Sequence, residues 1–298
     1  MDGIINVYKE KGFTSHDVVA KLRGILKMKK IGHTGTLDPQ AEGVLPVCLG
    51  KATKLCDFIT DRTKTYKAVL LLGKVTDTLD VFGRVIEENE CSVSAEEIAQ
   101  IIKSFVGKQE QVPPMYSALK VNGKKLYELA REGKTIERQS RVLEIFSIEI
   151  SEISLPRVTF TVTCSKGTYI RSLCDDIGKK AGCGGCMEEL TRTRSGNFDI
   201  NSALKLDEIQ ALVYAGRIEE HLMKMDSVFN DYSSLAIKKE YNKMLYNGNK
   251  MPVESIKKYD KQPNQNETVK IYDENGCFIG IYEFIEKEKS YKPVKLFI

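Results

Sequence analysis

The chain has 298 residues, of which 42% are hydrophobic and 29% are charged, and its formal net charge at pH 7 is +4. This composition excludes a disordered chain and provides enough apolar material for a core, while the length favours two domains. The longest aliphatic run, Ala68 to Leu72, is far too short to cross a bilayer, so we expect no membrane association. The first residues lack the basic and apolar regions of a signal peptide, which predicts a cytoplasmic protein.

Hydrophobic spacing predicts several elements along the first two thirds of the chain. Apolar residues on one face predict a helix from Ser15 to about Lys27, with Ser15 as its N-cap. The later elements, in chain order, are a buried strand from Thr65 to Gly73, a helix behind the capping box Ser94–Glu97, a half-buried strand over 158–164, and helices over about 169–180 and 207–214.

The composition changes near Tyr232, beyond which the chain is richer in Lys, Asn and Tyr. Two runs of β-forming residues flank Asn275-Gly276, a dipeptide typical of short hairpin turns. We therefore predict a domain over residues 1–230 and a small β domain over residues 231–298.

Cysteine and histidine give little indication of a metal site. The eight cysteines are scattered among apolar positions, which suits reduced thiols packed as small hydrophobic residues. The one C-x-x-C, Cys183 to Cys186, has no second pair or nearby histidine at zinc-finger spacing. With three histidines in the chain, a site built from several of them is not expected, and we predict no bound metal.

The segment GHTGTLDPQAEGVLPVCLGKATKL, residues 32–55, carries one acid, Asp38, among glycines, threonines and a proline. Turn chemistry can explain it, because Asp-Pro opens turns and glycine permits backbone angles that side chains forbid. Alternatively, the loop presents Asp38 as a functional carboxylate. The loop by itself leaves both interpretations open.

Two further segments carry candidate functional residues. Between Lys120 and Arg141 there are seven Lys/Arg against three Glu, with Tyr127 among them. This mixture suits RNA, because cations neutralise phosphates and aromatic rings stack on bases, but a solvated charged helix face explains it equally well. In KGTYIRSLCDD, Tyr169 and Arg171 lie where a strand leads into a helix, and Arg171 is either a surface residue or the partner of a carboxylate.

Taken together and in this order, four segments resemble the bacterial tRNA pseudouridine-55 synthases of the TruB type. They are GHTGTLDPQAEGVLPVCLGKATKL, KTYKAVLLLG, PPMYSALKVNGKKLYELAREG and KGTYIRSLCDDIGKKAGCGG. The resemblance runs from about Gly3 to Leu206, and the remaining C-terminal stretch is broadly similar to the family's small PUA-like RNA-binding domain. One departure is Glu10, which follows Lys9 where the family usually has proline.

The resemblance implies an α+β fold, in which a mixed, largely antiparallel sheet is flanked by helices and followed by a small C-terminal β domain. It implies that Asp38 is the catalytic nucleophile, that Tyr66 stacks on the target base and helps to remove its C5 proton, and that Arg171 pairs with Asp38. It also places a substrate-binding set at His33, Tyr169 and Leu190, and on a mobile RNA-binding insertion over about 113–141 with Lys120, Lys124, Lys125 and Arg131.

The same resemblance implies a substrate and a reaction. The substrate is the T stem-loop of tRNA, and uridine is isomerised to pseudouridine without a cofactor or metal, by a monomer that needs no obligate protein partner. Two alternatives remain at this point: an RNA-binding protein that has lost catalysis, and a synthase that acts on other RNAs in guide-RNA complexes.

Overall fold

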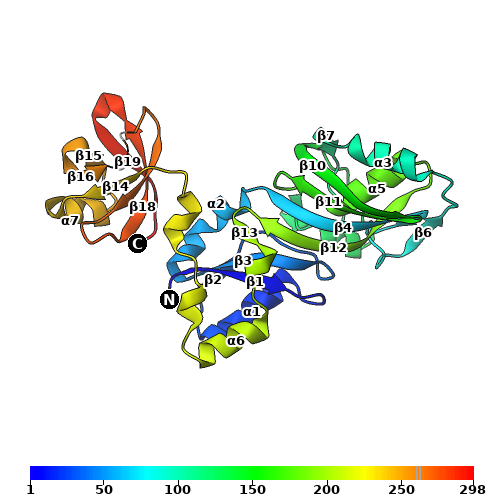
Figure 1. The fold of residues 1–298 in the computed structure, drawn as a ribbon, viewed down its shortest axis with the longest axis horizontal. Coiled ribbons are helices and arrows are strands. Elements are labelled where there is room, and N and C mark those ends of the chain that lie inside the picture. The colour runs from blue at the N-terminus through cyan, green and yellow to red at the C-terminus, as the bar shows by residue number, and fades with distance from the viewer. Residues whose placement is uncertain (122, 260, 262) are drawn as a thin grey trace.

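The computed structural model describes residues 1–121, 123–259, 261 and 263–298. These residues form two large sheets, one in a long body and one in a smaller C-terminal unit, and two two-stranded sheets (Figure 1). Within the described part of the chain, no helix is both long enough and apolar enough to cross a membrane.

The body is built on a nine-stranded mixed sheet. Its order is β1-β3-β12-β4-β11-β10-β7, with β2 on β3 and β13 on β12, and every pairing is antiparallel except that of β3 with β12. The strands are β1 (Gly3–Lys9), β2 (Ile31–His33), β3 (Glu42–Leu49), β4 (Lys64–Leu72), β7 (Gly107–Gln111), β10 (Arg141–Ser154), β11 (Arg157–Cys164), β12 (Gly185–Ser195) and β13 (Phe198–Asp199).

The parallel pairing of β3 with β12 joins the two halves of this sheet. Thr191 lies opposite Glu42, and Arg192 lies opposite Gly43. Gly43 has φ of +102°, and a Cβ there would lie 2.3 Å from the carbonyl oxygen of Arg192. Only glycine permits this close approach, so Gly43 fixes the position of Arg192 relative to the first half of the sheet.

Helices cover the sheet in two groups. The helices α1 (Ser15–Leu26) and α6 (Leu206–Tyr214) bury Leu22 and Ile209 with residues of β1 and β3, while α3 (Ala95–Lys103) and α5 (Ile170–Lys180) pack at the other half (Figure 1). Short helices are α2 (Cys56–Thr60), α4 (Leu126–Arg131) and α7 (Asn242–Tyr246).

The strands and helices predicted from hydrophobic spacing are all present, with one N-cap misplaced. Thr14 caps α1: its hydroxyl accepts the N–H of Asp17, and the Asp17 carboxylate accepts the N–H of Thr14. Ser15 is instead the first residue of the helix and is buried. The prediction of Ser15 as the cap is wrong because Thr14 and Ser15 both have capping side chains, and sequence alone does not rank them.

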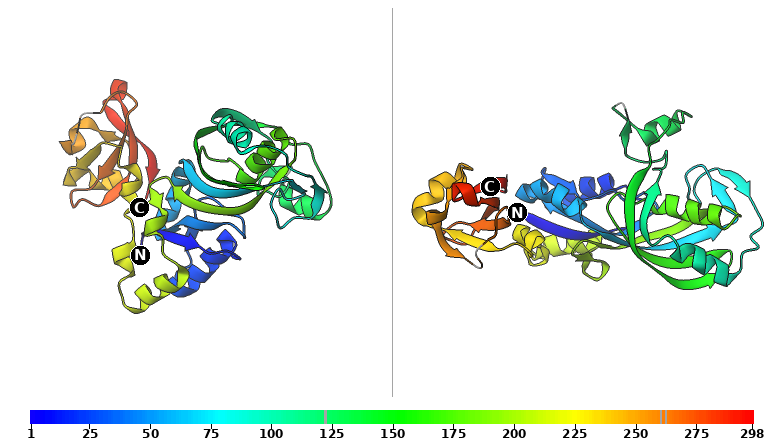
Figure 2. Two further views of the ribbon diagram at one scale, coloured as in Figure 1. Left: turned by 45° about the vertical axis from the view of Figure 1, so that its right-hand side comes forward. Right: turned by 90° about the horizontal axis from the view of Figure 1, so that it is seen from above.

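The insertion between β7 and β10 projects away from the sheet (right-hand view of Figure 2, green). It carries the short strands β8 (Lys120–Val121) and β9 (Lys124–Lys125), which pair with each other, and then α4. A second two-stranded hairpin, β5 (Lys74–Thr76) with β6 (Val85–Glu88), follows β4.

The C-terminal unit is a six-stranded sheet of order β15-β19-β18-β17-β14-β16. The hairpin predicted at Asn275-Gly276 is confirmed: β17 and β18 are antiparallel, Gly276 has φ of +81°, and the Asp273 carboxylate accepts the N–H groups of Asn275 and Cys277. The strands are β14 (Ser234–Ile237), β15 (Met251–Pro252), β16 (Ile256–Tyr259), β17 (Thr268–Tyr272), β18 (Phe278–Ile285) and β19 (Ser290–Leu296).

Aromatic packing joins the C-terminal unit to the body. Phe229 contacts Phe58 of the body at a ring-centroid distance of 5.3 Å, and Phe297 of the C-terminal unit at 5.9 Å. The Lys54 ammonium donates to the carbonyl oxygens of Leu296 and Ile298 at 3.2 and 2.8 Å. A mixed, largely antiparallel sheet with helices and a separate C-terminal β domain confirms the predicted fold class, while the boundary after residue 230 stays a prediction.

Candidate active site

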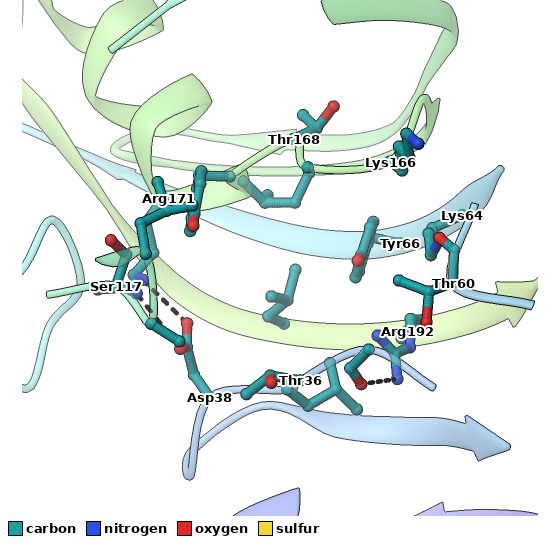
Figure 3. A pocket seen from close by; sticks show the side chains of 18 residues that line it. Thr36, Asp38, Thr60, Lys64, Tyr66, Ser117, Lys166, Thr168, Arg171 and Arg192 are labelled. Carbon is teal, nitrogen blue, oxygen red and sulfur yellow. Dashed lines mark hydrogen bonds and ion pairs between the residues drawn. The ribbon is translucent and has the colours of Figure 1, made fainter. Parts of the chain in front are cut away.

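A cavity of about 320 Å³ opens where the two halves of the sheet meet, a volume within the range of small-molecule sites (Figure 3). Its walls come from the loop after β2, the start of β4, the middle of β12, the turn from β11 into α5, and the insertion. The lining residues include Thr36, Asp38, Thr60, Lys64, Tyr66, Ser117, Lys166, Thr168, Tyr169, Arg171, Leu190 and Arg192.

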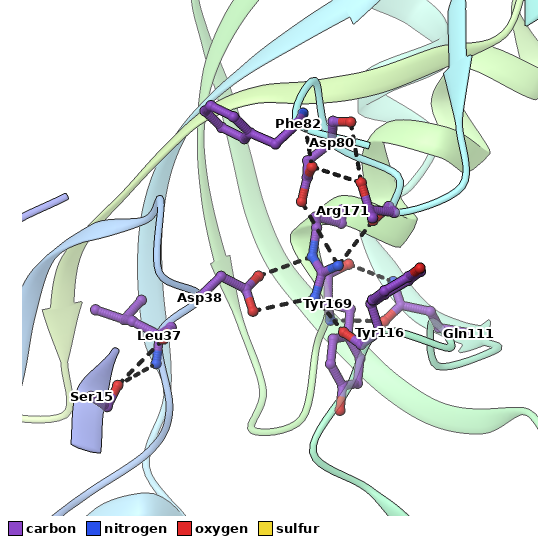
Figure 4. A network of polar contacts seen from close by, with 10 residues as sticks. Ser15, Leu37, Asp38, Asp80, Phe82, Gln111, Tyr116, Tyr169 and Arg171 are labelled. Carbon is purple, nitrogen blue, oxygen red and sulfur yellow. Dashed lines mark hydrogen bonds and ion pairs between the residues drawn. The ribbon is translucent and has the colours of Figure 1, made fainter. Parts of the chain in front are cut away.

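Asp38 and Arg171 meet at one end of this cavity (Figure 4). The Arg171 Nε lies 2.9 Å from Oδ2 of Asp38, and its Nη2 donates to Oδ1 at 3.3 Å. The Arg171 side chain is 5% exposed, whereas that of Asp38 is 39% exposed. A buried guanidinium therefore holds an accessible carboxylate by both oxygens, which fixes its orientation toward the cavity.

The remaining donors of Arg171 fix the guanidinium itself. Nη1 donates to the carbonyl oxygen of Thr78 at 2.9 Å, and Nη2 donates to that of Tyr116 at 2.7 Å. The Asp80 carboxylate lies 3.9 Å from Nη1. The arginine thereby ties α5 to the loop between β5 and β6 and to the insertion, and Asp80 is a partner that sequence reasoning missed.

The loop that carries Asp38 is held on both sides of that residue. The Leu37 N–H donates to the Ser15 hydroxyl at 2.9 Å, and the Lys9 ammonium donates to the carbonyl oxygens of Phe13 and Pro39 at 2.7 and 3.2 Å. Lys9 is fully buried, and this burial lowers its pKa to about 8. Since both anchors come from β1 and the start of α1, the first 15 residues position the Asp38 carboxylate.

Ser15→Ala should loosen this loop. The variant leaves the buried Leu37 N–H without its acceptor, which costs about 1–3 kcal/mol of folding stability, and we expect kcat to fall several-fold because Asp38 is less well positioned. Thermal melting and single-turnover assays measure both effects. Thr14→Ala is the matched control: it costs about 1 kcal/mol through loss of the helix cap, yet should leave kcat unchanged. Equal loss of kcat in both variants would contradict a specific role for Ser15.

Tyr66, Leu190 and Tyr169 form further parts of the wall. Tyr66 on β4 and Leu190 on β12 are both largely buried, and burial raises the pKa of the Tyr66 phenol. Tyr169 precedes α5, and its backbone N–H and C=O both bond the Gln111 side chain, at 2.8 and 3.0 Å. Burial also raises the pKa of Tyr169. The structure thus brings five predicted site residues together, with Asp38 and Arg171 as the other two.

The other predicted residues lie elsewhere. His33, the last residue of β2, is not among the described residues that line the cavity. Burial lowers the pKa of its imidazole, and its buried Nδ1 has no hydrogen-bond partner among the described residues. The insertion brings Ser117 to Leu119 to the cavity and carries the predicted cations farther out. These are Lys120, Lys124, Lys125 and Arg131, the last two with a charged group 5.4 Å from the centre of the Tyr127 ring.

Sequence reasoning missed three cations of the wall: Lys64, Lys166 and Arg192. Strand alternation could have found two of them, since Lys64 precedes Tyr66 by two residues on β4 and Arg192 follows Leu190 by two on β12. Burial lowers the pKa of Lys64 to about 8. Over the described ranges of the chain, no three His, Cys, Asp or Glu side chains gather as metal ligands would.

Comparisons with known proteins agree with this architecture at the level of fold and class. The chain aligns in structure with a solved Cbf5–Nop10–Gar1 complex, with a TM-score of 0.75 and 28% identity over 99% of this chain and 85% of that one. A solved H/ACA RNP bound to a substrate RNA gives a TM-score of 0.74 and 26% identity, with the same coverage.

The sequence comparisons define the class more narrowly. A family model described as "TruB family pseudouridylate synthase (N terminal domain)" matches residues 23–170, and "tRNA pseudouridylate synthase B C-terminal domain" matches residues 171–230. Relatives named tRNA pseudouridine synthase B are 51% identical in Lachnoclostridium phytofermentans, over 100% of both chains, and 46% identical in Clostridium acetobutylicum, over 99% of both. The chain belongs to the TruB family of pseudouridylate synthases. It is therefore an enzyme, an isomerase that acts on uridine in RNA.

Proposed function

We propose that the chain isomerises uridine 55 in the T loop of tRNA to pseudouridine, with Asp38 as the nucleophile and with no cofactor. The observation that carries this proposal is the Asp38 carboxylate, accessible from the cavity and held by the buried Arg171. Among the described residues that line the cavity, Asp38 is the one acid. The names of the relatives in the family supply the substrate class, tRNA.

The reaction conserves the atoms of the nucleotide apart from two exchanged protons. The N1–C1′ bond breaks, the base turns, a C5–C1′ bond forms, C5 loses its proton and N1 gains one. Asp38 can support this by adding to the base or by attacking the sugar at C1′, and both routes need an oriented carboxylate. Tyr66 stacks on the base and accepts the C5 proton. No electrons enter or leave, so no redox group is required.

A T-loop uridine must leave its stack to enter this cavity. Extruding a base costs a few kcal/mol, about 2–4, and least where the RNA is already loosened. We propose that the insertion over 113–141 closes on the extruded nucleotide, because Ser117 and Leu119 line the cavity while Lys124 and Arg131 lie farther out. His33, the last residue of β2 and directly before the loop that carries Asp38, contacts the substrate outside the cavity.

Two alternatives have less support. A protein that binds RNA without catalysis has no need of a carboxylate held in two-oxygen contact by a buried arginine. A synthase of guide-RNA complexes accords with the solved neighbours, whose sequences are 26–28% identical to this chain. The relatives named tRNA pseudouridine synthase B are 46–51% identical over nearly the whole chain.

The deciding experiment measures product from one unmodified tRNA transcript. Tritium at C5 of uridine should be released to water, and mapping should place pseudouridine at position 55. A transcript with cytidine at position 55 should release none. Tritium release from that control, or binding without release from the first transcript, would contradict the proposal.

We further propose the roles of the two domains. Residues 1–230 are the catalytic domain with its RNA-binding insertion, and residues 231–298 are a PUA-like domain that adds affinity for the tRNA body. The enzyme acts as a monomer without an obligate protein partner, in the cytoplasm where its tRNA substrate is found.

The insertion's charges give a separate prediction. Changing Lys124, Lys125 and Arg131 to Ala should weaken tRNA binding and flatten its salt dependence, by about 0.7–0.9 in the log–log slope for each lost phosphate contact. Binding titrations at several salt concentrations measure the slope. A control triple that keeps the charges, Lys124→Arg, Lys125→Arg and Arg131→Lys, should keep it. If the alanine triple has the wild-type slope, these side chains form only a solvated face.

A further inference from the structure

Arg192 and Tyr66 form a cross-strand pair at the centre of the cavity wall. They lie directly opposite each other where β12 pairs with β4, so both side chains emerge on the same face of the sheet. Both line the cavity, and Figure 3 shows the Arg192 side chain beside the loop that leads to Asp38. The phenol that faces the substrate therefore has a guanidinium as its neighbour.

The charge of Arg192 is buried, and no described residue supplies it with an acidic partner. The residue is 1% exposed; its Nε donates to the carbonyl oxygen of Val44 at 2.7 Å and its Nη2 to that of Gly35 at 3.2 Å. Over the described part of the chain, no carboxylate lies within ion-pair distance of this guanidinium. These carbonyl oxygens accept from two of its nitrogens but do not cancel its charge.

A buried and uncompensated charge is costly, and such groups concentrate at functional sites. Bracing the loop at Gly35 needs hydrogen-bond donors but no net charge. A neutral side chain could serve that structural purpose at a lower cost. The retained charge indicates that something beside Arg192 becomes negative during the reaction.

We propose that Arg192 is a positioning residue for the removal of the C5 proton, and that its guanidinium stabilises the negative oxygen of Tyr66. This inference rests on the proposed function, in which Tyr66 is the base. The Tyr66 phenol first gives its proton to water. After the C5–C1′ bond has formed, the phenolate oxygen takes the proton from C5. The C5–H electron pair becomes the C5=C6 double bond of pseudouridine. In return C6 gives up either its π bond to N1, whose electrons take up a proton at N1, or its bond to Asp38 where Asp38 has added to the base. Tyr66 is again a neutral phenol.

The surroundings of Tyr66 make such help necessary. Burial raises the pKa of its phenol, and the Cys164 thiol on β11 and the Asp38 carboxylate act in the same direction. The guanidinium of Arg192 opposes them by its charge and by hydrogen bonding. The other charged or titratable groups that line the cavity are Lys64 on β4, Lys166 before α5, and Tyr169 and Arg171 at the start of α5. Of the groups that change the pKa of the Tyr66 phenol, Arg192 is the one that favours its ionisation.

The test compares Arg192→Gln with Arg192→Lys, using tRNA that carries protium or deuterium at C5 of uridine 55. In Arg192→Gln the single-turnover rate at neutral pH should fall about tenfold or more. The pH at which the rate rises to half of its maximum should be higher by about one unit. The deuterium isotope effect should increase, because proton removal becomes slower than the other steps. Arg192→Lys, which keeps the charge, should recover part of the rate.

Two controls distinguish this role from a structural one. Arg194→Gln, two residues along β12 with a side chain that is 59% exposed, should leave the pH profile and isotope effect unchanged. In a Tyr66→Phe background, Arg192→Gln should have little further effect on the rate. An equal rate loss at every pH, with an unchanged isotope effect, would overturn the inference while leaving the proposed function intact. Absence of pseudouridine from the wild-type reaction would instead refute the proposed function.

Discussion

Asp38→Asn is expected to reduce pseudouridine formation below detection while tRNA affinity stays within about tenfold of the wild type. The substitution keeps the size of the side chain and most of its hydrogen bonds, but it removes the charge and the nucleophile that we propose. Loss of a nucleophile is typically worth several orders of magnitude in rate. Affinity is preserved because it depends mainly on phosphate and loop contacts far from one carboxylate.

The structure supplies controls for this variant. Glu42, the other acid of the loop segment, lies on β3 and does not line the cavity, so Glu42→Gln should keep most of its activity. Arg171 loses its ion pair in Asp38→Asn but keeps the Thr78 and Tyr116 carbonyl oxygens, so a melting curve should show a folded protein. If Asp38 only formed a turn, Asn would serve equally well, and near-normal turnover by the folded variant would restore that interpretation.

The local features of this chain could be predicted from sequence because they depend on neighbouring residues. Alternation on β11 places Val158, Phe160 and Val162 in the core, and Asn275-Gly276 lies in the hairpin turn. The capping box Ser94–Glu97 is present with both of its hydrogen bonds. In each case the pattern and the hydrogen bonds that it predicts lie within a few residues of each other.

The site was less accessible to sequence reasoning, because long-range pairing assembles it. Asp38 and Arg171 are separated by 133 positions, and the carbonyl oxygen of Thr78 is 93 positions from Arg171. Nothing local indicates that Asp80 lies beside Arg171, because that contact depends on the β5–β6 connection. Alternation puts Arg192 on the same face of β12 as Leu190, but its approach to the loop at Gly35 depends on the parallel pairing of β3 with β12. The resemblance to the TruB family named Asp38, Tyr66 and Arg171, but not these supporting residues.

The C-terminal unit shows a related limit. The predicted boundary follows Asn230, yet Phe229 packs against Phe58 of the body and against Phe278 and Phe297 of the C-terminal sheet. Deleting residues 231–298 would expose this aromatic cluster, so a truncated chain would lose stability as well as RNA contacts. Charge changes on the C-terminal surface are therefore a cleaner test of its role in tRNA binding than truncation.

Arg171→Lys is expected to lower kcat by about two to three orders of magnitude even though the positive charge remains. A lysine ammonium is a single point and cannot contact both Asp38 oxygens together with the carbonyl oxygens of Thr78 and Tyr116. The carboxylate then loses its fixed orientation, and buried acceptors lose their donors. We also expect the free energy of unfolding to fall by about 2–4 kcal/mol.

Arg157→Lys is the matched control, because Arg157 makes the same kind of two-point contact with Glu188, at 2.7 and 2.9 Å, but on the surface with its side chain 55% exposed. Surface pairs contribute about 0–1 kcal/mol, so this variant should change neither stability nor kcat appreciably. Single-turnover assays and denaturant titrations of both variants measure the difference. Since the two arginines differ mainly in burial and in what they orient, a comparable rate for Arg171→Lys and Arg157→Lys would show that Asp38 does not depend on the guanidinium for its orientation.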